Sequence, residues 1–285
     1  MHIPARFAEA LSTHLAMNVA TEPGLSVPLM LAIHGSMGSG KTVMCREMLS
    51  RMRVIPIPVF ADAFESFKAG EPPEEVRERY MRAARINADI AAGEDVPSPI
   101  GGEATLAVVV VDDLDQRIGN DPGSDVQKTQ NTQLINAALM ELADSPQLVD
   151  GVPAYRTPIV VTANHLDWIY PPVVRTGRME TFHWEPTPEE RAAILLDIFP
   201  HFTAAICGEL ITRFPHATIS DFAATRYQLY RDAVAGAVRR LPPDRMIAAA
   251  RDRDWTARVD APALDFAAVA EVLGSIGETR IGWSA

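Results

Sequence analysis

Short apolar runs alternate with longer segments of helical periodicity over the N-terminal part of the chain. Four such runs occupy residues 27–33, 54–60, 106–111 and 158–162. Strands that alternate with helices predict an α/β fold in which helices flank a parallel sheet. The second and third runs are continuous rather than alternating, which is typical of strands buried on both faces. We therefore expect those two in the middle of the sheet.

The segments between these runs predict helices over 43–52, 72–92 and 126–143. Two prolines open the second of these helices, where a missing backbone N–H costs little because helix starts leave their N–H groups unpaired anyway. Arg6, Glu9 and His14 lie within an amphipathic pattern at the N-terminus. The stretch 93–102 is rich in glycine and proline, which predicts a surface loop.

A change of pattern predicts a boundary between two domains. Thr187 is placed to cap a helix, Pro188 fits the first helical position, and Glu190 completes a capping box. Beyond this point no strand-like run recurs, and helical stretches separated by prolines follow. We expect an α/β domain over residues 1–185 and a mainly helical domain over residues 186–285.

Composition narrows the classes of function. The 285 residues carry a net charge of −11, so a general electrostatic affinity for nucleic acid or anionic lipid is not expected. No apolar run approaches the ~20 residues that a membrane helix needs, and the N-terminus lacks the continuous apolar segment of a secretory signal. Cys45 and Cys207 are too far apart to read as a metal site, and a reducing, cytoplasmic location fits them best.

One motif joins the first apolar run directly to a predicted helix. It is Gly35-Ser36-Met37-Gly38-Ser39-Gly40-Lys41-Thr42, which has the GxxxxGK[ST] spacing of a phosphate-binding loop. Small residues let backbone N–H groups approach phosphates at a helix N-terminus. Lys41 would neutralise phosphate oxygens and the Thr42 hydroxyl would bind Mg²⁺, so ATP and Mg²⁺ are the expected cofactors.

Two successive carboxylates, Asp112 and Asp113, end the third apolar run. The carboxyl edge of a parallel sheet is where ligands bind in α/β folds. Asp112 would hold Mg²⁺ through water, and Asp113 could activate the attacking water as a general base. The alternative is an acidic turn that caps a helix.

Three further polar residues follow the fourth run. Asn164 comes directly after it, which would place a neutral amide beside the γ-phosphate as a nucleotide sensor, although an asparagine there is also a common turn residue. Arg175 and Arg178 stand three positions apart and could reach the phosphate of a neighbouring subunit, where an arginine supplied in trans stabilises transition-state charge. A solvated surface pair is the alternative.

Two other candidates depend more heavily on context. Arg226, in a helical stretch of the C-terminal domain, could contact phosphate or be an ordinary surface arginine. A segment bounded by glycine and proline after the second run could form an exposed gripping loop or pack its aromatic side chains in the core. It consists of Phe64, Glu65, Ser66, Phe67 and Lys68.

The order of these motifs resembles that of AAA+ ATPases, and the residues within and around them are similar to those of the Rubisco activases. The similarity runs from about residue 6 to residue 240 and includes letters that are not generic to AAA+ proteins. These are Val27-Pro28-Leu29, Ala69-Gly70-Glu71-Pro72, Arg79-Tyr80, Asp113-Leu114-Asp115, Asn136-Ala137, Leu139-Met140, Gly177-Arg178-Met179-Glu180 and Trp184 with Pro186-Thr187. The chain departs from the resemblance at His34, Asp112 and Gln228.

The resemblance implies an ATP-driven machine of six subunits that remodels a client protein. By resemblance, Lys41 and Thr42 belong to Walker A, Asp112 and Asp113 to Walker B, and Asn164 is sensor 1. The same likeness makes Arg175 and Arg178 arginine fingers, Arg226 a sensor 2 residue, residues 64–69 a pore loop, and the C-terminal domain a helical lid. The family releases inhibitory sugar phosphates from Rubisco, which makes Rubisco the expected client.

Two other classes of protein share a phosphate-binding loop. An AAA+ module that handles nucleic acid, such as a loader or a transposition regulator, would need a basic stripe. The chain offers Arg239-Arg240 and scattered arginines interleaved with aspartates, so this is the less favoured alternative. A small-molecule kinase is disfavoured by the Asn164 and paired-arginine pattern.

Overall fold

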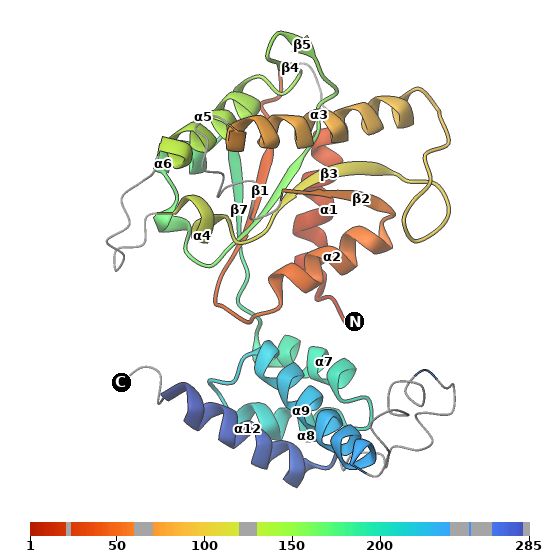
Figure 1. Cartoon of the computed structure of the whole chain (residues 1–285), viewed down its shortest axis with the longest axis vertical. Coiled ribbons are helices and arrows are strands. Elements are labelled where there is room, and N and C mark those ends of the chain that lie inside the picture. Colours follow the sequence, from red (N-terminus) through yellow and green to blue (C-terminus); the bar gives the residue numbers. More distant parts are fainter. Residues whose placement is uncertain (21–23, 60–70, 120–129, 240–250, 252–263, 282–285) are drawn as a thin grey trace. The chain divides into compact units, whose positions relative to one another are not determined.

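A computed structural model gives the fold of the chain (Figure 1). It describes residues 1–20, 24–59, 71–119, 130–239, 251 and 264–281. The chain forms two compact units. The larger one comprises Ile3–Glu185, and the smaller one comprises Pro186–Ala285 together with Met1–His2.

A five-stranded parallel sheet forms the centre of the larger unit, in the order β2-β3-β6-β1-β7. The bounds of the strands are β1 Met30–His34, β2 Val54–Pro58, β3 Leu106–Val111, β6 Ile159–Ala163 and β7 Met179–His183. The α/β prediction is confirmed, and each of the four apolar runs overlaps a strand. The β3 and β6 side chains are buried throughout, so the centre of the sheet is also the centre of the core.

One prediction about the order of the strands is wrong. The runs 54–60 and 106–111 were both expected in the middle of the sheet, but of these two only β3 is an interior strand, and β2 is an edge strand. Pro56 and Pro58 give the physical reason, because a proline has no N–H to donate to a second neighbouring strand and is confined to sheet edges. The two prolines therefore outweigh the apolar character of the run.

Two strand features were not predicted. The fifth strand, β7, pairs with β1 at the other edge, and of its side chains only Met179 is buried. A small antiparallel hairpin joins β4 (Leu148–Val149) to β5 (Val152–Pro153) through Asp150 and Gly151. Both turn residues have positive φ, of 49° and 79°, which is the backbone that an Asp-Gly turn favours.

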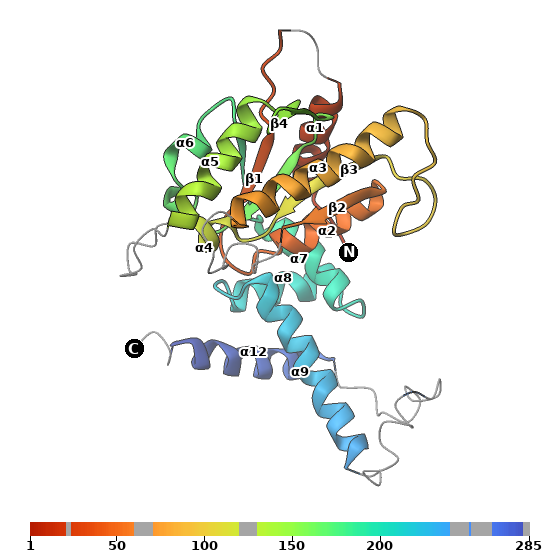
Figure 2. The same cartoon turned by 45° about the horizontal axis from the view of Figure 1, so that its top comes forward.

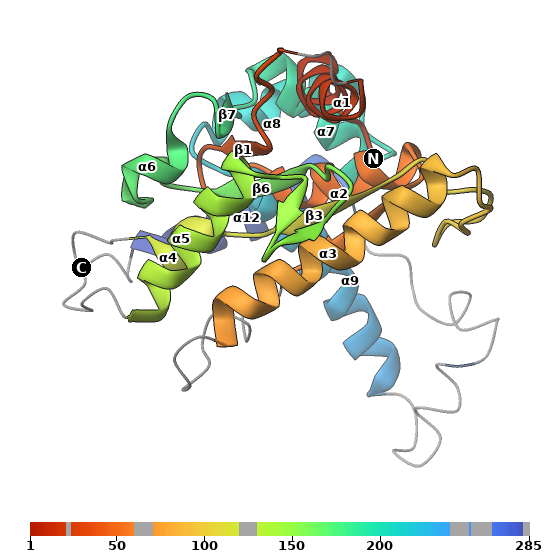
Figure 3. The ribbon, with the colours of Figure 1, turned by 90° about the horizontal axis from the view of Figure 1, so that it is seen from above.

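Helices flank the sheet of the larger unit, with α3 and α5 packed side by side over one face and α1 over the other (Figure 3). The helix bounds are α1 Ala5–Val19, α2 Lys41–Arg51, α3 Glu71–Ala91, α4 Leu114–Ile118, α5 Gln130–Asp144 and α6 Pro171–Val174, with a 3-10 turn at Leu166–Trp168. The helices expected over 43–52 and 72–92 are confirmed, as is the described part of the one over 126–143. In the segment 93–102 the described backbone is irregular apart from one bridge between Pro97 and Glu103.

The smaller unit is helical in its described part (Figure 2). Its helices are α7 Pro188–Ile198, α8 Ala204–Arg213, α9 Ile219–Val238 and α12 Phe266–Ile281, and α12 packs across α9. The capping box at the start of α7 is confirmed, because the Glu190 N–H donates to Thr187 Oγ1 and the Thr187 N–H donates to Glu190 Oε2. In the part of the chain that the structure describes, no helix has the length and apolar character required to cross a membrane.

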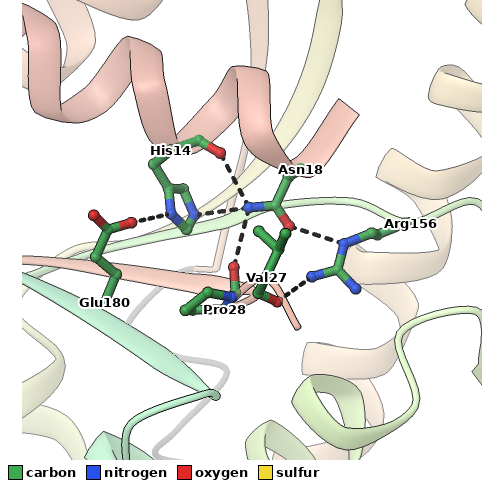
Figure 4. A network of polar contacts seen from close by, with 6 residues as sticks. All are labelled: His14, Asn18, Val27, Pro28, Arg156 and Glu180. Carbon is green, nitrogen blue, oxygen red and sulfur yellow. Dashed lines mark hydrogen bonds and ion pairs between the residues drawn. The ribbon is translucent and has the colours of Figure 1, made fainter. Parts of the chain in front are cut away.

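A buried polar network ties α1 to the sheet of the larger unit (Figure 4). Asn18 donates from Nδ2 to the carbonyl oxygens of Pro28 and His14 and accepts from Arg156 Nε at its own Oδ1. The ring of His14 is 1% exposed, and its Nδ1 lies 3.0 Å from Glu180 Oε2 on β7. These side chains satisfy one another, so the network fixes where α1 lies on the sheet.

We expect the stability of the larger unit to fall on acidification because of His14. Burial lowers the pKa of His14 from 6.5, with the nearby Glu180 carboxylate opposing the shift. Below about pH 6.5 the unfolded chain therefore binds a proton that the folded chain binds only at lower pH. This part of the stability is complete above that pH and is lost as pH falls. Thermal unfolding between about pH 7.5 and about pH 5.5 should show it.

The matched variants are His14→Gln and, as control, a change of the exposed His216 to Gln. The fall in melting temperature on acidification should be smaller in His14→Gln than in the wild type and unchanged in the control. An equal fall in all three proteins would show that His14 does not cause the pH dependence.

Candidate functional site

The phosphate-binding motif forms the connection between β1 and α2. Residue Gly35 follows the last residue of β1, and α2 begins at Lys41. Within the described part of the chain, no side chain caps the start of α2. Its first backbone N–H groups are therefore available to an anion, as is usual where a glycine-rich loop precedes a helix.

Trp184 fixes the shape of this loop. Its backbone N–H donates to the carbonyl of His34, and its indole Nε1–H donates to the carbonyl of Ser39 at 3.0 Å. Gly35 has φ 151°, and a Cβ there would lie 2.0 Å from the carbonyl oxygen of Trp184. Only glycine allows the backbone to come this close to Trp184, so the loop packs directly against the residue that follows β7.

Lys41 is buried in the loop, and no carboxylate of the described segments forms an ion pair with its ammonium. Its Nζ donates to the carbonyls of Gly35 at 2.8 Å and Ser36 at 2.9 Å, and to Asn164 Oδ1 at 2.9 Å. The residue is 5% exposed, and burial lowers the pKa of its ammonium while nearby acidic groups oppose the shift. Among the described residues all three acceptors are neutral, so a bound anion would compensate a charge that is otherwise unpaired.

Strand register brings the polar residues of three strands to one edge of the sheet. Val111 on β3 is opposite Val161 on β6, so Asp112 comes next to Thr162. His34 on β1 is opposite Ala163 on β6, so Gly35 comes next to Asn164. The carboxyl ends of parallel strands thus gather the carboxylates, the amide and the phosphate-binding loop, as the sequence predicts.

Asp112 makes a hydrogen bond or ion pair with three side chains. Its Oδ1 accepts from Thr42 Oγ1 at 3.0 Å and from Thr162 Oγ1 at 2.9 Å. Its Oδ2 accepts from Arg46 Nη2 at 2.6 Å. The contact between Asp112 and Thr42 is the one expected if both residues serve the same metal ion.

Asp113 occupies an unusual backbone position beside them. It has φ 51° and ψ 50°, the left-handed region that costs about 1 kcal/mol for a side chain other than glycine. Its N–H donates to Thr162 Oγ1. Burial and the neighbouring carboxylates of Asp112 and Asp115 raise the pKa of Asp113, whereas nearby cations lower it. A carboxylate with a raised pKa is a stronger base than an ordinary aspartate.

These groups fit a nucleoside triphosphate with its metal ion. The buried ammonium of Lys41, bonded to neutral acceptors alone among the described residues, and the N–H groups at the start of α2 suit phosphate oxygens. The hydroxyl of Thr42 donates its proton to Asp112, which leaves its oxygen lone pairs for a hard cation such as Mg²⁺. The chemistry of this donor set is therefore the one expected from the sequence.

The two arginines proposed to act in trans differ in their surroundings. Arg178 forms a bidentate pair with Asp144, at 2.7 Å from Nε and 2.6 Å from Nη2, and also donates to the carbonyl of Pro172. This pair holds the pKa of Asp144 below its ordinary value. Arg175 is exposed at the end of α6, and within the described residues its side chain has no hydrogen bond or ion pair. Arg175 is thus the freer of the two.

One further predicted part of the site lies on the helical unit, and another lies outside the described residues. Arg226 lies on α9 of the helical unit, where its guanidinium is 5.6 Å from the centre of the Tyr230 ring. The proposed gripping loop, Phe64 to Lys68, lies outside the described residues. The roles of both stay predictions.

Arg46 and Thr162 were not singled out from the sequence, and Asp115 was named only as part of a motif, without a role of its own. Arg46 stands four positions after Thr42 on α2, a spacing that shares a helix face and could have indicated it. Thr162 is fully buried at the end of β6. Asp115 is 2% exposed and accepts the His165 N–H at Oδ2, which anchors the residue after Asn164.

Comparisons with known proteins agree with this geometry. Residues 31–186 match the family described as ATPase family associated with various cellular activities (AAA). The chain is 36% identical over 241 residues to the ribulose bisphosphate carboxylase/oxygenase activase of Malus domestica and 35% identical over 242 residues to that of Anabaena sp.. Each match covers 82% of this chain but 52% and 55% of the relative, so the chain spans about half the length of these curated relatives.

A solved structure shares the fold at low sequence identity. It is the HORMA:CdnC:Trip13 complex of E. coli MS115-1, one chain of which superposes with a TM-score of 0.57 at 15% identity. The superposition covers 95% of this chain and 87% of the other.

Proposed function

The chain belongs to the ATPase family associated with various cellular activities (AAA) and is similar, within it, to the Rubisco activases, and from this premise we propose that it is an ATP-driven oligomeric motor that remodels Rubisco. The observation that carries the ATPase part is the convergence of Lys41, Thr42, Asp112 and Asn164 at one edge of the sheet. The client is proposed from the similarity to the activases.

ATP binding begins at the phosphate-binding loop. Lys41 exchanges its bonds to the loop carbonyls for bonds to phosphate oxygens, and the N–H groups at the start of α2 bind the remaining oxygens. Mg²⁺, when bound by Thr42 and through water by Asp112, would offset the phosphate charge. Asn164, released from Lys41, is then free to hold a water or a phosphate oxygen with its amide.

Hydrolysis depends on Asp113 in this proposal. A water between Asp113 and the γ-phosphate gives its proton toward the carboxylate as its oxygen attacks phosphorus, and the bond from phosphorus to the bridging β-phosphate oxygen breaks, which releases ADP. The raised pKa of Asp113 makes that transfer easier. Asp115 acts indirectly, because it holds the backbone next to Asn164 and so positions the amide.

Arginine supplied from a neighbouring subunit completes the proposed site, which is why we propose a ring, with six subunits by resemblance. Arg175 is exposed and makes no hydrogen bond or ion pair among the described residues, so it is the better candidate to reach out. Arg178 reaches a neighbour only by leaving Asp144.

We expect Arg175→Ala to abolish the ATPase activity gained on assembly while leaving the melting temperature unchanged. Arg178→Ala should lower both the ATPase activity and the melting temperature, because it also leaves Asp144 without its ion-pair partner. The loss of this partly exposed pair should lower the free energy of unfolding by up to about 1 kcal/mol. The matched control is Asp144→Asn, which breaks the same pair but keeps both arginines. Full activity of Arg175→Ala in assembled rings would exclude Arg175 as the finger.

The remaining features of the motor are proposed from the family likeness. The helical unit acts as a lid that responds to nucleotide through Arg226, and residues 64–68 grip the client from the pore of the ring. Cys45 and Cys207 are both free and buried, which supports a reducing, cytoplasmic compartment.

The deciding experiment measures ATPase rate and carboxylase recovery together, with and without Rubisco locked by an inhibitory sugar phosphate. ATP-dependent recovery by the wild type, absent in Lys41→Ala, is the expected result. Robust ATPase activity without recovery would keep the motor and remove Rubisco as its client. Absence of ATPase activity in the assembled protein would overturn the proposal as a whole.

A further inference from the structure

A cation of the chain itself covers one oxygen of the carboxylate at the proposed metal site. Arg46 Nη2 lies 2.6 Å from Asp112 Oδ2. The Asp112 side chain is 19% exposed, whereas that of Arg46 is 68% exposed. The pair therefore joins a partly desolvated anion to a cation that reaches in from the surface.

The other oxygen of Asp112 is already occupied. Its Oδ1 accepts hydrogen bonds from both Thr42 and Thr162. The Thr162 hydroxyl also accepts the N–H of Asp113, so its proton is directed at Oδ1. Oδ2 is thus the oxygen left for an arriving cation or for the water that a cation carries, and Arg46 covers it.

The charges around Asp112 give this contact its weight. The carboxylates of Asp112, Asp113 and Asp115 lie within four consecutive positions, and those of Asp112 and Asp115 act electrostatically on Asp113. Lys41 and Arg117 oppose them from within the site. Without Arg46 the cluster would attract a divalent cation more strongly, because a partly buried charge is screened less than an exposed one.

We propose that Arg46 is a built-in competitor of Mg²⁺, which neutralises Asp112 in the nucleotide-free subunit and yields Oδ2 when the metal enters with ATP. The proposal rests on the nucleotide site argued above. Arg46 thereby sets the metal affinity below the value that the carboxylate alone would give, and it restores the neutral pair when the metal leaves with ADP. An exposed side chain suits this exchange, since it has solvent to return to.

The test compares the affinity for a fluorescent, non-hydrolysable ATP analogue in saturating Mg²⁺ with that in EDTA. The ratio of the two affinities isolates the contribution of the metal, and the binding of Mg²⁺ to free nucleotide cancels between variants. Arg46→Ala and Arg46→Gln should raise this ratio by about fivefold, the upper range for one partly exposed ion pair. Arg46→Lys, which keeps the charge, should stay near the wild type.

Arg51 supplies the matched control, because it lies on the same helix and pairs with Glu47 instead of Asp112. Arg51→Ala should leave the ratio unchanged. An unchanged or lower ratio in both Arg46→Ala and Arg46→Gln overturns the competition while leaving the ATPase proposal intact. Failure of the wild type to bind the analogue with or without metal overturns the nucleotide site and the competition with it.

Discussion

Replacement of Asp113 by asparagine should leave ATP binding intact and lower ATP turnover by about 10²–10⁴-fold, the usual contribution of a positioned general base. The substitution keeps the size of the side chain but removes its basicity. Within the described residues the Asp113 carboxylate has no hydrogen bond or ion pair, so no structural contact is lost. Steady-state ATPase rates and calorimetric ATP titrations of the assembled protein measure the two effects separately.

Asp89 offers a control for this variant, since it is an exposed aspartate on α3 away from the sheet edge. Asp89→Asn should keep both binding and turnover. Normal turnover by purified Asp113→Asn would remove the assignment of Asp113 as the base, and loss of ATP binding would point to a role in holding nucleotide instead.

Replacement of Lys41 by alanine should weaken ATP binding on the order of a hundredfold, because charge-assisted hydrogen bonds contribute roughly 1.5–3 kcal/mol. The loss follows from the position of the ammonium, which is buried in the loop and bonded to neutral acceptors alone among the described residues. Equilibrium binding of labelled ATP measures it, and turnover should fall with it.

A second effect of this change must be separated from the first. Lys41→Ala leaves the carbonyl of Gly35 and the amide oxygen of Asn164 without the Lys41 donor, whereas the Ser36 carbonyl keeps its bond from Ser39 Oγ, so some stability is lost too. Lys41→Met fills most of the same volume, and its melting temperature without nucleotide reports the structural part. Binding within a few fold of the wild type in both variants would contradict the proposed role of Lys41.

The parts of the site that could be predicted from the sequence are residues that lie close together in the chain or directly after an apolar run. Gly35 to Thr42 lie within one turn and one helix start, so their grouping needs no knowledge of the rest of the fold. Asp113 and Asn164 follow apolar runs, and the rule that parallel strands end at one edge was enough to bring them together.

The remaining parts depend on contacts between distant positions. Arg46 meets Asp112 across 66 positions, and Thr162 meets it across 50, so their roles follow from register and helix placement that composition does not reveal. Strand β7 was not predicted because an edge strand with one buried side chain has no apolar run in its sequence. The two prolines of β2 indicated an edge strand, but the prediction followed the apolar pattern of the run instead.

Those two prolines also bear on aggregation. The N–H of Val59 donates to Val110 on β3, and alternate residues of a strand point the same way, so the N–H groups of Ile55 and Ile57 turn toward β3 as well. Pro56 and Pro58 therefore occupy the outward side, where a bare edge would otherwise offer its donors to another chain. Sheet extension between molecules is therefore blocked at the β2 edge.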